Sequence, residues 1–300
     1  MKSVLIAGGS GMIGSKLIKK LKQKNINIVL LSTKTNYKSL TNSYYWNPDQ
    51  KNFPEIDLSQ FDTCINLCGA GIFDQNFTPQ RKKILYDSRI HPIDFLYEQF
   101  LKAKVKLPCF ISGSATGIYP NICLNELSEN STHGDGFIPN LVETWEESAL
   151  KFNNIADRTI IIRTGIVFSD SGGFVQQISK PIKYFAGAIP GSGKQYVSWI
   201  HVDDWVELLI HLADKNEQGL FNATAPEPET LENISQFIAK KMHRPGFMPH
   251  LPVWLLKLIF GKERHELLLT DQKVSAQKVL ETGFKFQFPN YQSALNDIIK

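Results

Sequence analysis

The sequence predicts an α/β fold with a doubly wound parallel sheet, followed by a smaller, mainly helical C-terminal portion. Two observations carry this prediction. Over residues 1–170 short apolar runs alternate with longer amphipathic runs, an order typical of strand–helix–strand units. Runs such as Ile160–Ile162 are apolar at consecutive positions, as are strands that a parallel sheet buries on both faces.

The elements follow from these runs in chain order. The expected strands are Ser3–Ala7, Asn27–Leu31, Thr63–Leu67, Cys109–Ser112 and Thr159–Arg163. The expected helices are Met12–Lys24, Pro79–Lys104 and Leu141–Phe152. Beyond Thr164, glycines and prolines indicate a loop-rich segment, after which a helix begins near Asp203 or Asp204, either of which can cap it.

The chain divides accordingly into two portions. We expect residues 1–170 to form a cofactor-binding domain to which residues 201–225 return. Residues 171–200 and 226–300 are expected to form the substrate-side portion. Its apolar run Val253–Phe260 is short and interrupted by lysine, which favours a packed helix over a membrane anchor.

Composition indicates a soluble globular protein. Of 300 residues, 42% are hydrophobic and 21% charged, and the net charge of 33 − 29 = +4 is spread without a long basic run. This predicts a small-molecule substrate and neither a nucleic-acid nor a membrane partner. The cysteines, at 64, 68, 109 and 123, have no zinc-site spacing and indicate free thiols. The N-terminal apolar run is too short for a signal peptide, so we expect a cytoplasmic monomer or homodimer.

A glycine-rich turn follows the first strand and opens the first helix. Glycines there allow unusual dihedral angles and a close approach of the backbone to a pyrophosphate, while the helix N-terminus offers N–H donors. The order strand, turn, helix, strand makes this the turn of a Rossmann-like dinucleotide site. The expected contacts are Gly8, Gly11, Met12, Ile13 and Gly14.

The end of the second strand indicates which dinucleotide is bound. NAD-selective sites usually place a carboxylate there, about 20 residues past the glycines. This chain has Ser32, Thr33 and Lys34, and no carboxylate before Asp49. Two hydroxyls and a cation suit a 2′-phosphate, so NADP(H) is favoured over NAD(H), although Lys34 can equally be a solvated loop residue.

Further segments resemble one subgroup of the extended short-chain dehydrogenase/reductase superfamily. They are Ile65–Ala70, Ser88–Arg89, Ile111–Tyr119, Arg163–Val167, Gly191–Gln195, Ser198–Asp204 and Phe221–Pro226. Together they resemble the atypical "epimerase family protein" group, NAD-dependent epimerase/dehydratase-like chains with a small C-terminal domain of unknown function. The resemblance implies a Rossmann-like fold and a nicotinamide cofactor more firmly than it implies a substrate.

The resemblance also implies further cofactor contacts. Helix 79–104 passes beside the cofactor in the superfamily, which places Arg89 there, although a structural ion pair is equally open. Strand ends supply the rest: Leu67, Cys68, Gly69, Ser112, Gly113 and Arg163. Ala70 stands where the subgroup often has glutamate, and Pro120 where it often has glycine.

Superfamily catalysis normally uses a Tyr-x-x-x-Lys pair, in which lysine lowers the tyrosine pKa. None of the nine tyrosines has lysine four residues downstream. Ser114, or Ser112, remains at a strand end, and Tyr119 is the best substitute proton donor. The alternative is that Tyr119 packs over the cofactor.

His201, Asp203 and Asp204 lie close together in sequence. Helix capping explains the aspartates better than a metal does, so no metal site is expected. His201 is a lesser candidate for a substrate-facing acid or base. Lys194, with Gln195 and Trp199, follows a glycine-rich loop and can meet a phosphate or carboxylate, or be solvated.

These features favour an atypical NADP(H)-dependent oxidoreductase acting on an unidentified small carbonyl or hydroxyl compound. In it Ser114 and Tyr119 hydrogen-bond the substrate oxygen. Two alternatives stay open: a nucleotide-sugar epimerase or dehydratase, and a non-catalytic NADP(H)-binding sensor or regulatory module.

Overall fold

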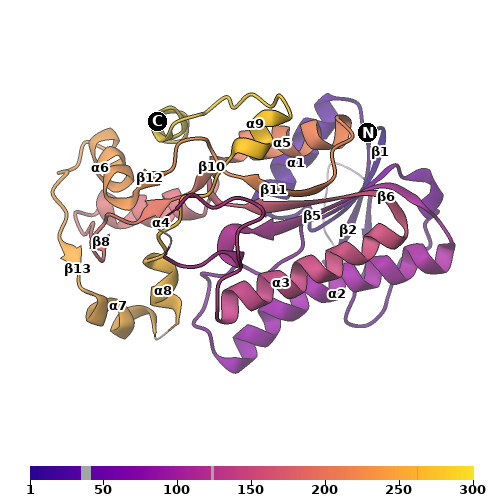
Figure 1. The fold of residues 1–300 in the computed structure, drawn as a ribbon, viewed down its shortest axis with the longest axis horizontal. Coiled ribbons are helices and arrows are strands. Elements are labelled where there is room, and N and C mark those ends of the chain that lie inside the picture. The colour runs from indigo at the N-terminus through magenta and orange to yellow at the C-terminus, as the bar shows by residue number, and fades with distance from the viewer. Residues whose placement is uncertain (35–41, 123–124, 262) are drawn as a thin grey trace.

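A seven-stranded parallel sheet forms the centre of the protein (Figure 1). The computed structural model describes residues 1–34, 42–122, 125–261 and 263–300. The strand order is β11-β6-β5-β4-β1-β2-β3. The strands are β1 (Ser3–Ala7), β2 (Asn27–Ser32), β3 (Asn42–Tyr45), β4 (Thr63–Asn66), β5 (Leu107–Ala115), β6 (Ala156–Thr164) and β11 (Gly219–Ala223).

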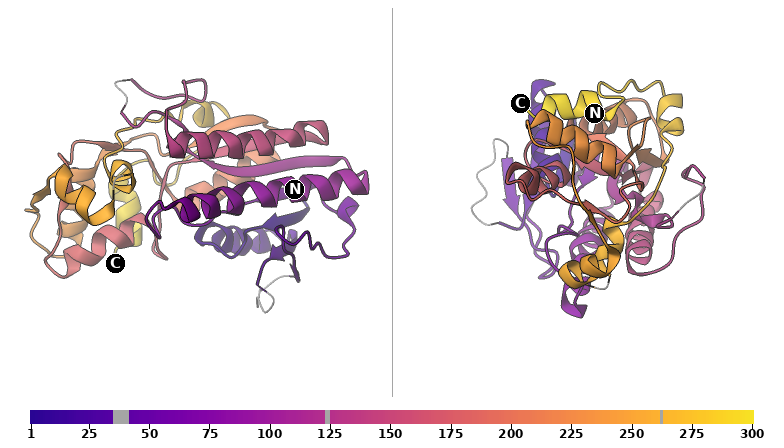
Figure 2. Two further views of the ribbon diagram at one scale, coloured as in Figure 1. Left: turned by 90° about the horizontal axis from the view of Figure 1, so that it is seen from below. Right: turned by 90° about the vertical axis from the view of Figure 1, so that its left-hand side faces the viewer.

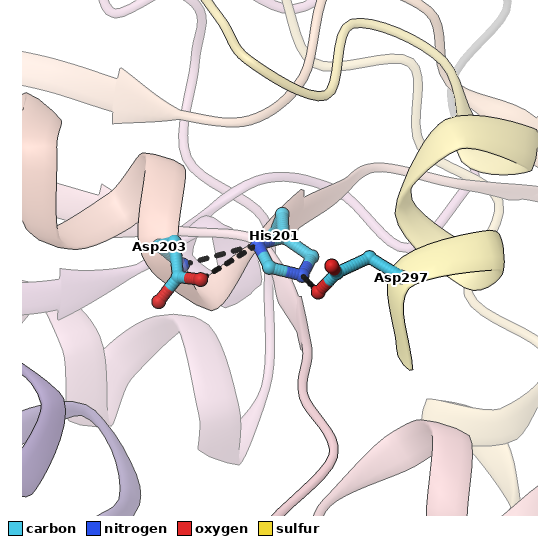
Figure 3. Close-up of side chains that lie close together, drawn as sticks. All are labelled: His201, Asp203 and Asp297. Atoms are coloured by element: carbon cyan, nitrogen blue, oxygen red, sulfur yellow. Dashed lines mark hydrogen bonds and ion pairs between the residues drawn. The ribbon is translucent and has the colours of Figure 1, made fainter. Parts of the chain in front are cut away.

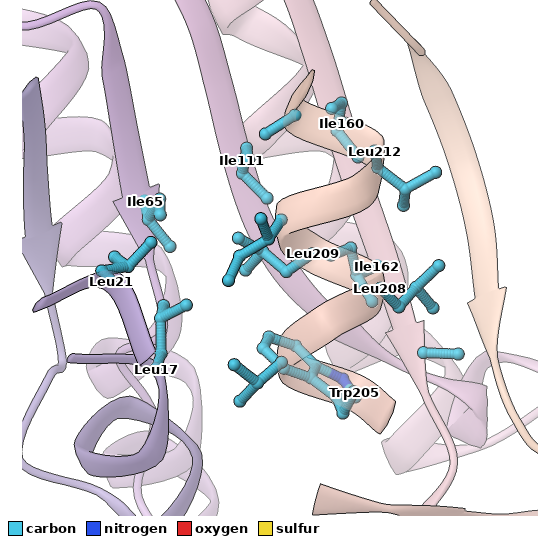
Figure 4. Packing of buried hydrophobic residues seen from close by; sticks show 14 of the residues in the cluster. Leu17, Leu21, Ile65, Ile111, Ile160, Ile162, Trp205, Leu208, Leu209 and Leu212 are labelled. Atoms are coloured by element: carbon cyan, nitrogen blue, oxygen red, sulfur yellow. The ribbon is translucent and has the colours of Figure 1, made fainter. Parts of the chain in front are cut away.

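Helices cover both faces of this sheet, which confirms the doubly wound α/β prediction (Figures 1 and 2). The helices α1 (Met12–Gln23) and α5 (Val202–Asp214) lie on one face, and α2 (Pro79–Ala103) and α3 (Phe137–Leu150) on the other. On the first face, Trp205, Leu208 and Leu209 of α5 pack with Leu17 of α1 over the isoleucines of the central strands (Figure 4). Burial of these side chains on both faces holds the strand ends in fixed positions.

Most predicted strands lie where the apolar runs placed them. β1 has the expected bounds, whereas β5 and β6 extend past the predicted strands at both ends, β5 to Leu107 and Ala115 and β6 to Ala156 and Thr164. β3 was not expected: it is an edge strand with the polar sequence Asn-Ser-Tyr-Tyr, mostly exposed, and gives no apolar signal.

In the middle of the chain one expectation was incomplete and another was wrong. The loop-rich segment after Thr164 also contains a helix, α4 (Phe174–Lys183), which buries Val175 and Ile182. Neither Asp203 nor Asp204 caps the next helix. α5 begins at Val202, and its N-cap is His201, whose side chain accepts a hydrogen bond from the N–H of Asp203.

The remaining elements form a second cluster beside the carboxyl ends of the strands. Its short strands are β7 (Ile166–Phe168), β8 (Ile189–Pro190), β9 (Tyr196–Val197), β10 (Trp199–His201), β12 (Glu229–Thr230) and β13 (His250–Leu251). Its helices are α4, α6 (Leu231–Lys241), α7 (Val253–Phe260), α8 (Arg264–Leu268) and α10 (Tyr291–Ile298). α9 (Gln277–Glu281) packs instead against β11, with Val279 in the core beneath α5. The single-turn helices η1 (Leu58–Gln60), η2 (Thr116–Ile118) and η3 (Lys151–Asn154) complete the chain.

The helix predicted over Val253–Phe260 is present as α7, but it is packed only in part. Leu256 is its buried residue, and most of its other apolar side chains are exposed. No helix among the described residues is both long enough and apolar enough to cross a membrane.

Candidate functional site

The candidate site lies where the direction of sheet winding changes. β1 has β2 on one side and β4 on the other, and the chain visits the two halves of the sheet in turn. In doubly wound folds ligands bind at the carboxyl ends of the strands at such a switch point. Here that edge consists of the Gly8–Gly14 turn after β1 and the residues that follow β4.

The glycines of this turn are required by close backbone approaches. Gly8 has φ +81°, and a β-carbon on it would lie 2.5 Å from the backbone N of Cys68. A β-carbon on Gly14 would lie 2.7 Å from the backbone of Gly9, so only glycine lets α1 pack this closely. A β-carbon on Gly11, in contrast, would meet only the carbonyl oxygen of Gly8, at 3.9 Å. The turn is therefore closed toward the sheet and open at Gly11.

The open side of the turn coincides with the N-terminus of α1. Gly11 is the N-cap, and no side chain caps the helix. The first N–H groups of α1, beginning at Met12 and Ile13, therefore keep their donors and the positive end of the helix dipole for a ligand. At the end of β4, the amide Nδ2 of Asn66 is a buried donor without a hydrogen-bond partner in the described structure. These features fit the pyrophosphate of a dinucleotide.

The end of β2 presents hydroxyls and one cation. Ser32 is buried, and its hydroxyl oxygen accepts a hydrogen bond from the N–H of Lys34 at 3.1 Å. Thr33 and Lys34 are exposed. Asp49, the first carboxylate along the chain, bonds to His91 at 2.7 Å. Residues 35–41, which follow Lys34, lie outside the described residues.

Arg89 holds the loop that follows β4 and forms no ion pair in the described part of the chain. Its guanidinium donates to the carbonyl oxygens of Leu85, at 3.2 Å, and Ala70, at 3.0 Å, and lies over the Trp145 ring. Burial, with the nearby Arg81, lowers the pKa of Arg89 to about 10. A β-carbon on Gly69 would lie 3.3 Å from this guanidinium. Arg89 therefore stabilises the backbone of the loop that follows β4.

Ser114 and Arg163 meet a residue that sequence reasoning did not single out, Glu146 of α3. The Arg163 guanidinium donates Nε to Oε1 and Nη2 to Oε2 of this carboxylate, both at 2.8 Å, and Ser114 donates to Oε1 at 2.5 Å. Burial opposes the charge on Arg163, but the Glu146 carboxylate holds its pKa above the usual range. All three side chains are buried, so they form a closed ion-pair network.

Tyr119 belongs to the same network and is completely buried. Its hydroxyl donates to Asn222 Oδ1 at 2.7 Å and accepts from Arg163 Nη1 at 3.0 Å. Burial raises the pKa of Tyr119, and Arg163 offsets this only in part. In this arrangement the protons of Ser114 and Tyr119 both go to protein acceptors, Glu146 and Asn222. Ser112 is also buried, and donates to the carbonyl oxygen of Gly113.

The covering of Tyr119 comes from residues 271–275, an extended segment that the sequence did not mark. Gln272 Nε2 donates to the carbonyl oxygens of Tyr119 and Pro120, at 3.1 and 2.8 Å. Asn222 Nδ2 donates to the carbonyl oxygen of Ser275. These bonds attach the segment to β11 and to the loop after η2. The segment therefore covers the carboxyl ends of β5, β6 and β11.

His201 lies between two aspartates (Figure 3). Its Nδ1 accepts from the N–H of Asp203, so the ring proton is on Nε2, 3.4 Å from the carboxylate of Asp297 in α10. Its ring packs 3.9 Å from that of Phe288, and burial lowers its pKa. Nε2 is buried and forms no hydrogen bond in the described structure, although it lies near the Asp297 carboxylate. Because Nδ1 caps α5 and the ring is buried, the arrangement favours capping over a role toward substrate.

Lys194, the candidate cation for a substrate phosphate or carboxylate, lies in a loop whose neighbouring side chains bond to protein carbonyl groups. Gln195 Nε2 donates to the carbonyl oxygens of Pro190 and Leu268, and Trp199 Nε1 to that of Glu227. Lys194 is exposed. Only Lys194 among these three keeps its polar group available to a ligand.

Comparisons with known proteins agree with this architecture. Residues 4–132 match the NAD dependent epimerase/dehydratase family, and residues 251–298 match a domain of unknown function. An epimerase family protein of Staphylococcus aureus is 33% identical over 303 residues, and the match covers 100% of both chains. One of Staphylococcus haemolyticus is 32% identical over 305 residues, and the match covers 100% of this chain and 99% of its own.

Solved structures are similar as well. The structure of the human epimerase family protein SDR39U1 (isoform 2) with NADPH has a TM-score of 0.88 and 28% identity, with 99% coverage of both chains. A nucleoside-diphosphate sugar epimerase of Corynebacterium glutamicum shares the fold, with a TM-score of 0.78 and 23% identity, over 99% of this chain and 58% of its own.

Proposed function

The chain belongs to the epimerase family proteins, and from this premise we propose that it is an atypical oxidoreductase that binds NADP(H) at the β1–β4 switch point. The observation that carries the proposal is the open helix N-terminus at Gly11, beside a strand end with Ser32, Thr33 and Lys34 and no carboxylate. The human relative whose structure is described with NADPH supports the choice of cofactor.

In the proposed complex the pyrophosphate lies at the N-terminus of α1, where N–H donors and the helix dipole stabilise its charge. Lys34, with Ser32 and Thr33, meets the 2′-phosphate, because a cation and hydroxyl donors suit a dianion. The loop after β4, which Arg89 supports, lines the other side. The cofactor supplies or accepts a hydride, and the protein orients it.

The proposed substrate is a small carbonyl or hydroxyl compound. In the reductive direction the carbonyl oxygen of such a substrate would also need a proton, which the protein would supply. Tyr119 can supply that proton when a substrate oxygen replaces Asn222 Oδ1 as its acceptor, while Arg163, held by Glu146, keeps its hydrogen bond to the tyrosine oxygen. The raised pKa of Tyr119 makes it a donor rather than a base, which disfavours an epimerase or dehydratase mechanism that begins from a tyrosinate.

The closed network also supports a second candidate, a non-catalytic NADP(H)-binding sensor. Tyr119 is completely buried and every polar group around it has a protein partner, as in a structural core. In that case cofactor binding changes the conformation or partners of the protein and no hydride is transferred.

Titration with NADPH and NADH, followed by nicotinamide fluorescence, tests the cofactor assignment. We expect NADPH to bind at least about tenfold more tightly than NADH. Lys34→Ala should remove most of this difference. Lys24 is a matched control, because it is also exposed but precedes β2 and so lies at the other end of that strand. Lys24→Ala should leave the difference in affinity unchanged. Equal affinities in the unmodified protein would contradict the proposal. NADPH consumption against a panel of carbonyl compounds then separates the oxidoreductase from the sensor.

A further inference from the structure

α4, α6, the β8–β13 pair and α7 lie together at one end of the molecule (Figures 1 and 2). These segments expose large apolar side chains. Phe185, after α4, is 71% exposed and Phe247, between α6 and β13, is 91% exposed. On α7, Trp254 is 68% and Leu258 76% exposed. Side chains of this size and number on one end mark an interaction surface rather than scattered exposure.

Contacts between the segments hold these side chains on a common framework. Arg244 donates Nε to the carbonyl oxygen of Lys183 at 3.1 Å, and its guanidinium lies 4.6 Å from the centre of the Phe185 ring. β13, which lies between Phe247 and Trp254 in the chain, pairs with β8. Phe185 has φ 60°, a left-handed conformation in which a bulky residue is unusual, so the fold keeps an aromatic ring outward at a position that suits glycine.

Cations outnumber carboxylates in these segments. Residues 171–201 and 240–261 contain no aspartate or glutamate. Their lysines and arginine are Lys180, Lys183, Lys194, Lys240, Lys241, Arg244 and Lys257. Two carboxylates flank these ranges. Glu232, in the first turn of α6, accepts from Gln236 at 3.1 Å and lies 3.8 Å from His250 Nε2. Glu263 pairs with Lys82 at 2.6 Å. The charge of this end is therefore strongly positive although the whole chain carries only +4.

A shallow hollow lies beside two of these cations. It has a volume of about 620 Å³ and is lined by Gln236, Lys240, Arg244, Gly246 and Phe247. Lys240 is in the last turn of α6 and Arg244 follows the end of the helix, so both charges border the same hollow. They would attract an anion there, and Phe247 adds an apolar side chain at the rim.

We propose that this α7 surface, comprising Phe185, Phe247, Trp254 and Leu258 with Lys183, Lys240, Arg244 and Lys257, binds the surface of an anionic phospholipid bilayer. The aromatic and aliphatic side chains enter the interfacial region, and the cations face the lipid headgroups. Exposed Trp, Phe and Leu beside Lys and Arg, with few carboxylates, have the composition of interfacial membrane-binding segments. A second copy of this chain is a poorer occupant, because a symmetric contact would bring the same cations together.

This proposal revises the expectation of no membrane partner and does not depend on the cofactor assignment. The expectation rested on the net charge and on the run 253–260 taken as a packed helix. The segregation of charge becomes apparent only when the fold brings residues 180–190 and 240–260 to the same end. Surface binding requires no spanning helix.

Trp254 provides a direct probe, because Trp46, Trp145, Trp199 and Trp205 are buried. The full-length protein is mixed with vesicles of phosphatidylcholine alone or of phosphatidylcholine with phosphatidylserine. We expect it to float with the anionic vesicles only, with a blue shift of tryptophan emission and quenching by brominated lipid. Trp254→Phe should still float, but lose the shift and the quenching.

Charge and apolar variants have matched controls. Lys240→Gln with Arg244→Gln should weaken vesicle binding roughly thirtyfold, since two basic groups near the lipid are removed. Lys19→Gln with Lys24→Gln removes equal charge from α1 and should change binding little. Leu258→Ser should weaken binding, whereas Leu101→Ser on α2 should not.

Three results would overturn the proposal. The first is no flotation with anionic vesicles, which would leave an acidic protein as the occupant. The second is an equal loss of binding in the control variants. The third is a stable dimer whose Trp254 emission is already shifted without lipid, since a second copy would then cover the surface.

Discussion

Removing the Arg163 guanidinium is expected to destabilise the protein strongly, because it leaves the Glu146 carboxylate buried without its cation and with a hydrogen bond from the Ser114 hydroxyl. Arg163 is 1% exposed and makes two bonds of 2.8 Å to Glu146. Breaking a buried pair of this kind by removing one partner costs about 3–5 kcal/mol. We therefore expect Arg163→Met to lower the free energy of unfolding by about that amount, a large share of the roughly 5–15 kcal/mol of a typical domain.

Urea unfolding followed by tryptophan fluorescence measures this change. The double variant Arg163→Met with Glu146→Leu removes both charges and should be more stable than the single Arg163→Met, because the unpaired carboxylate is gone. Loss of less than about 1 kcal/mol in the single variant would refute the reasoning. So would a double variant whose loss equals the sum of the two single losses, since the pair would then not be coupled.

Three further predictions concern separate parts of the chain. Gly14→Ala should lower stability by about 1–3 kcal/mol, because its β-carbon would lie 2.7 Å from backbone, whereas Gly11→Ala should cost under about 1 kcal/mol in urea unfolding. Equal losses would contradict the geometry of the turn. Burial lowers the pKa of His201 in the folded protein, so below about pH 6.5 the unfolded chain binds more protons than the folded one. The free energy of unfolding therefore falls as the pH is lowered below about 6.5, and this residue contributes at most about 1.4 kcal/mol per pH unit. In urea titrations at several pH values, His201→Gln should reduce the dependence of stability on pH. His243→Gln, at an exposed histidine, should leave that dependence unchanged. An unchanged pH dependence in His201→Gln would refute the prediction. Burial raises the pKa of Cys64, which is 0% exposed, so a maleimide at pH 8 should label Cys64 only after unfolding, as judged by peptide mass spectrometry. Rapid labelling of Cys64 in the folded protein would contradict this.

The architecture was predictable where burial leaves a local pattern. The apolar runs of β1, β4 and β6 and the glycine turn all derive from requirements within a few residues of chain. β3 escaped because an exposed edge strand needs no apolar alternation. The cap of α5 was misassigned because aspartate is the commoner capping residue, and nothing local shows that His201 turns its Nδ1 toward the helix.

Of the candidate site, only the part proposed to bind the cofactor was predictable from the sequence. The glycine turn and the Ser32–Lys34 strand end are about 20 residues apart, so their proposed joint role follows from local spacing. The partners of Tyr119 lie far from it along the chain: Asn222 is 103 residues away and Arg163 44 residues away. No local signal reports that Gln272 covers this tyrosine, and burial is what turns it from a candidate base into a partner within a closed network.

The segment 271–275 also bears on how the protein folds. The bond from Gln272 to the carbonyl oxygen of Tyr119 joins residues 153 positions apart, and those to Ser198 join residues 74 to 76 apart. Contacts of such sequence separation form late, because long loops must close before they contribute. During synthesis the sheet edge beside Tyr119 therefore stays open until residue 275 has left the ribosome. A ribosome-bound chain ending before residue 271 should expose this edge to chaperones and proteases that the complete chain excludes.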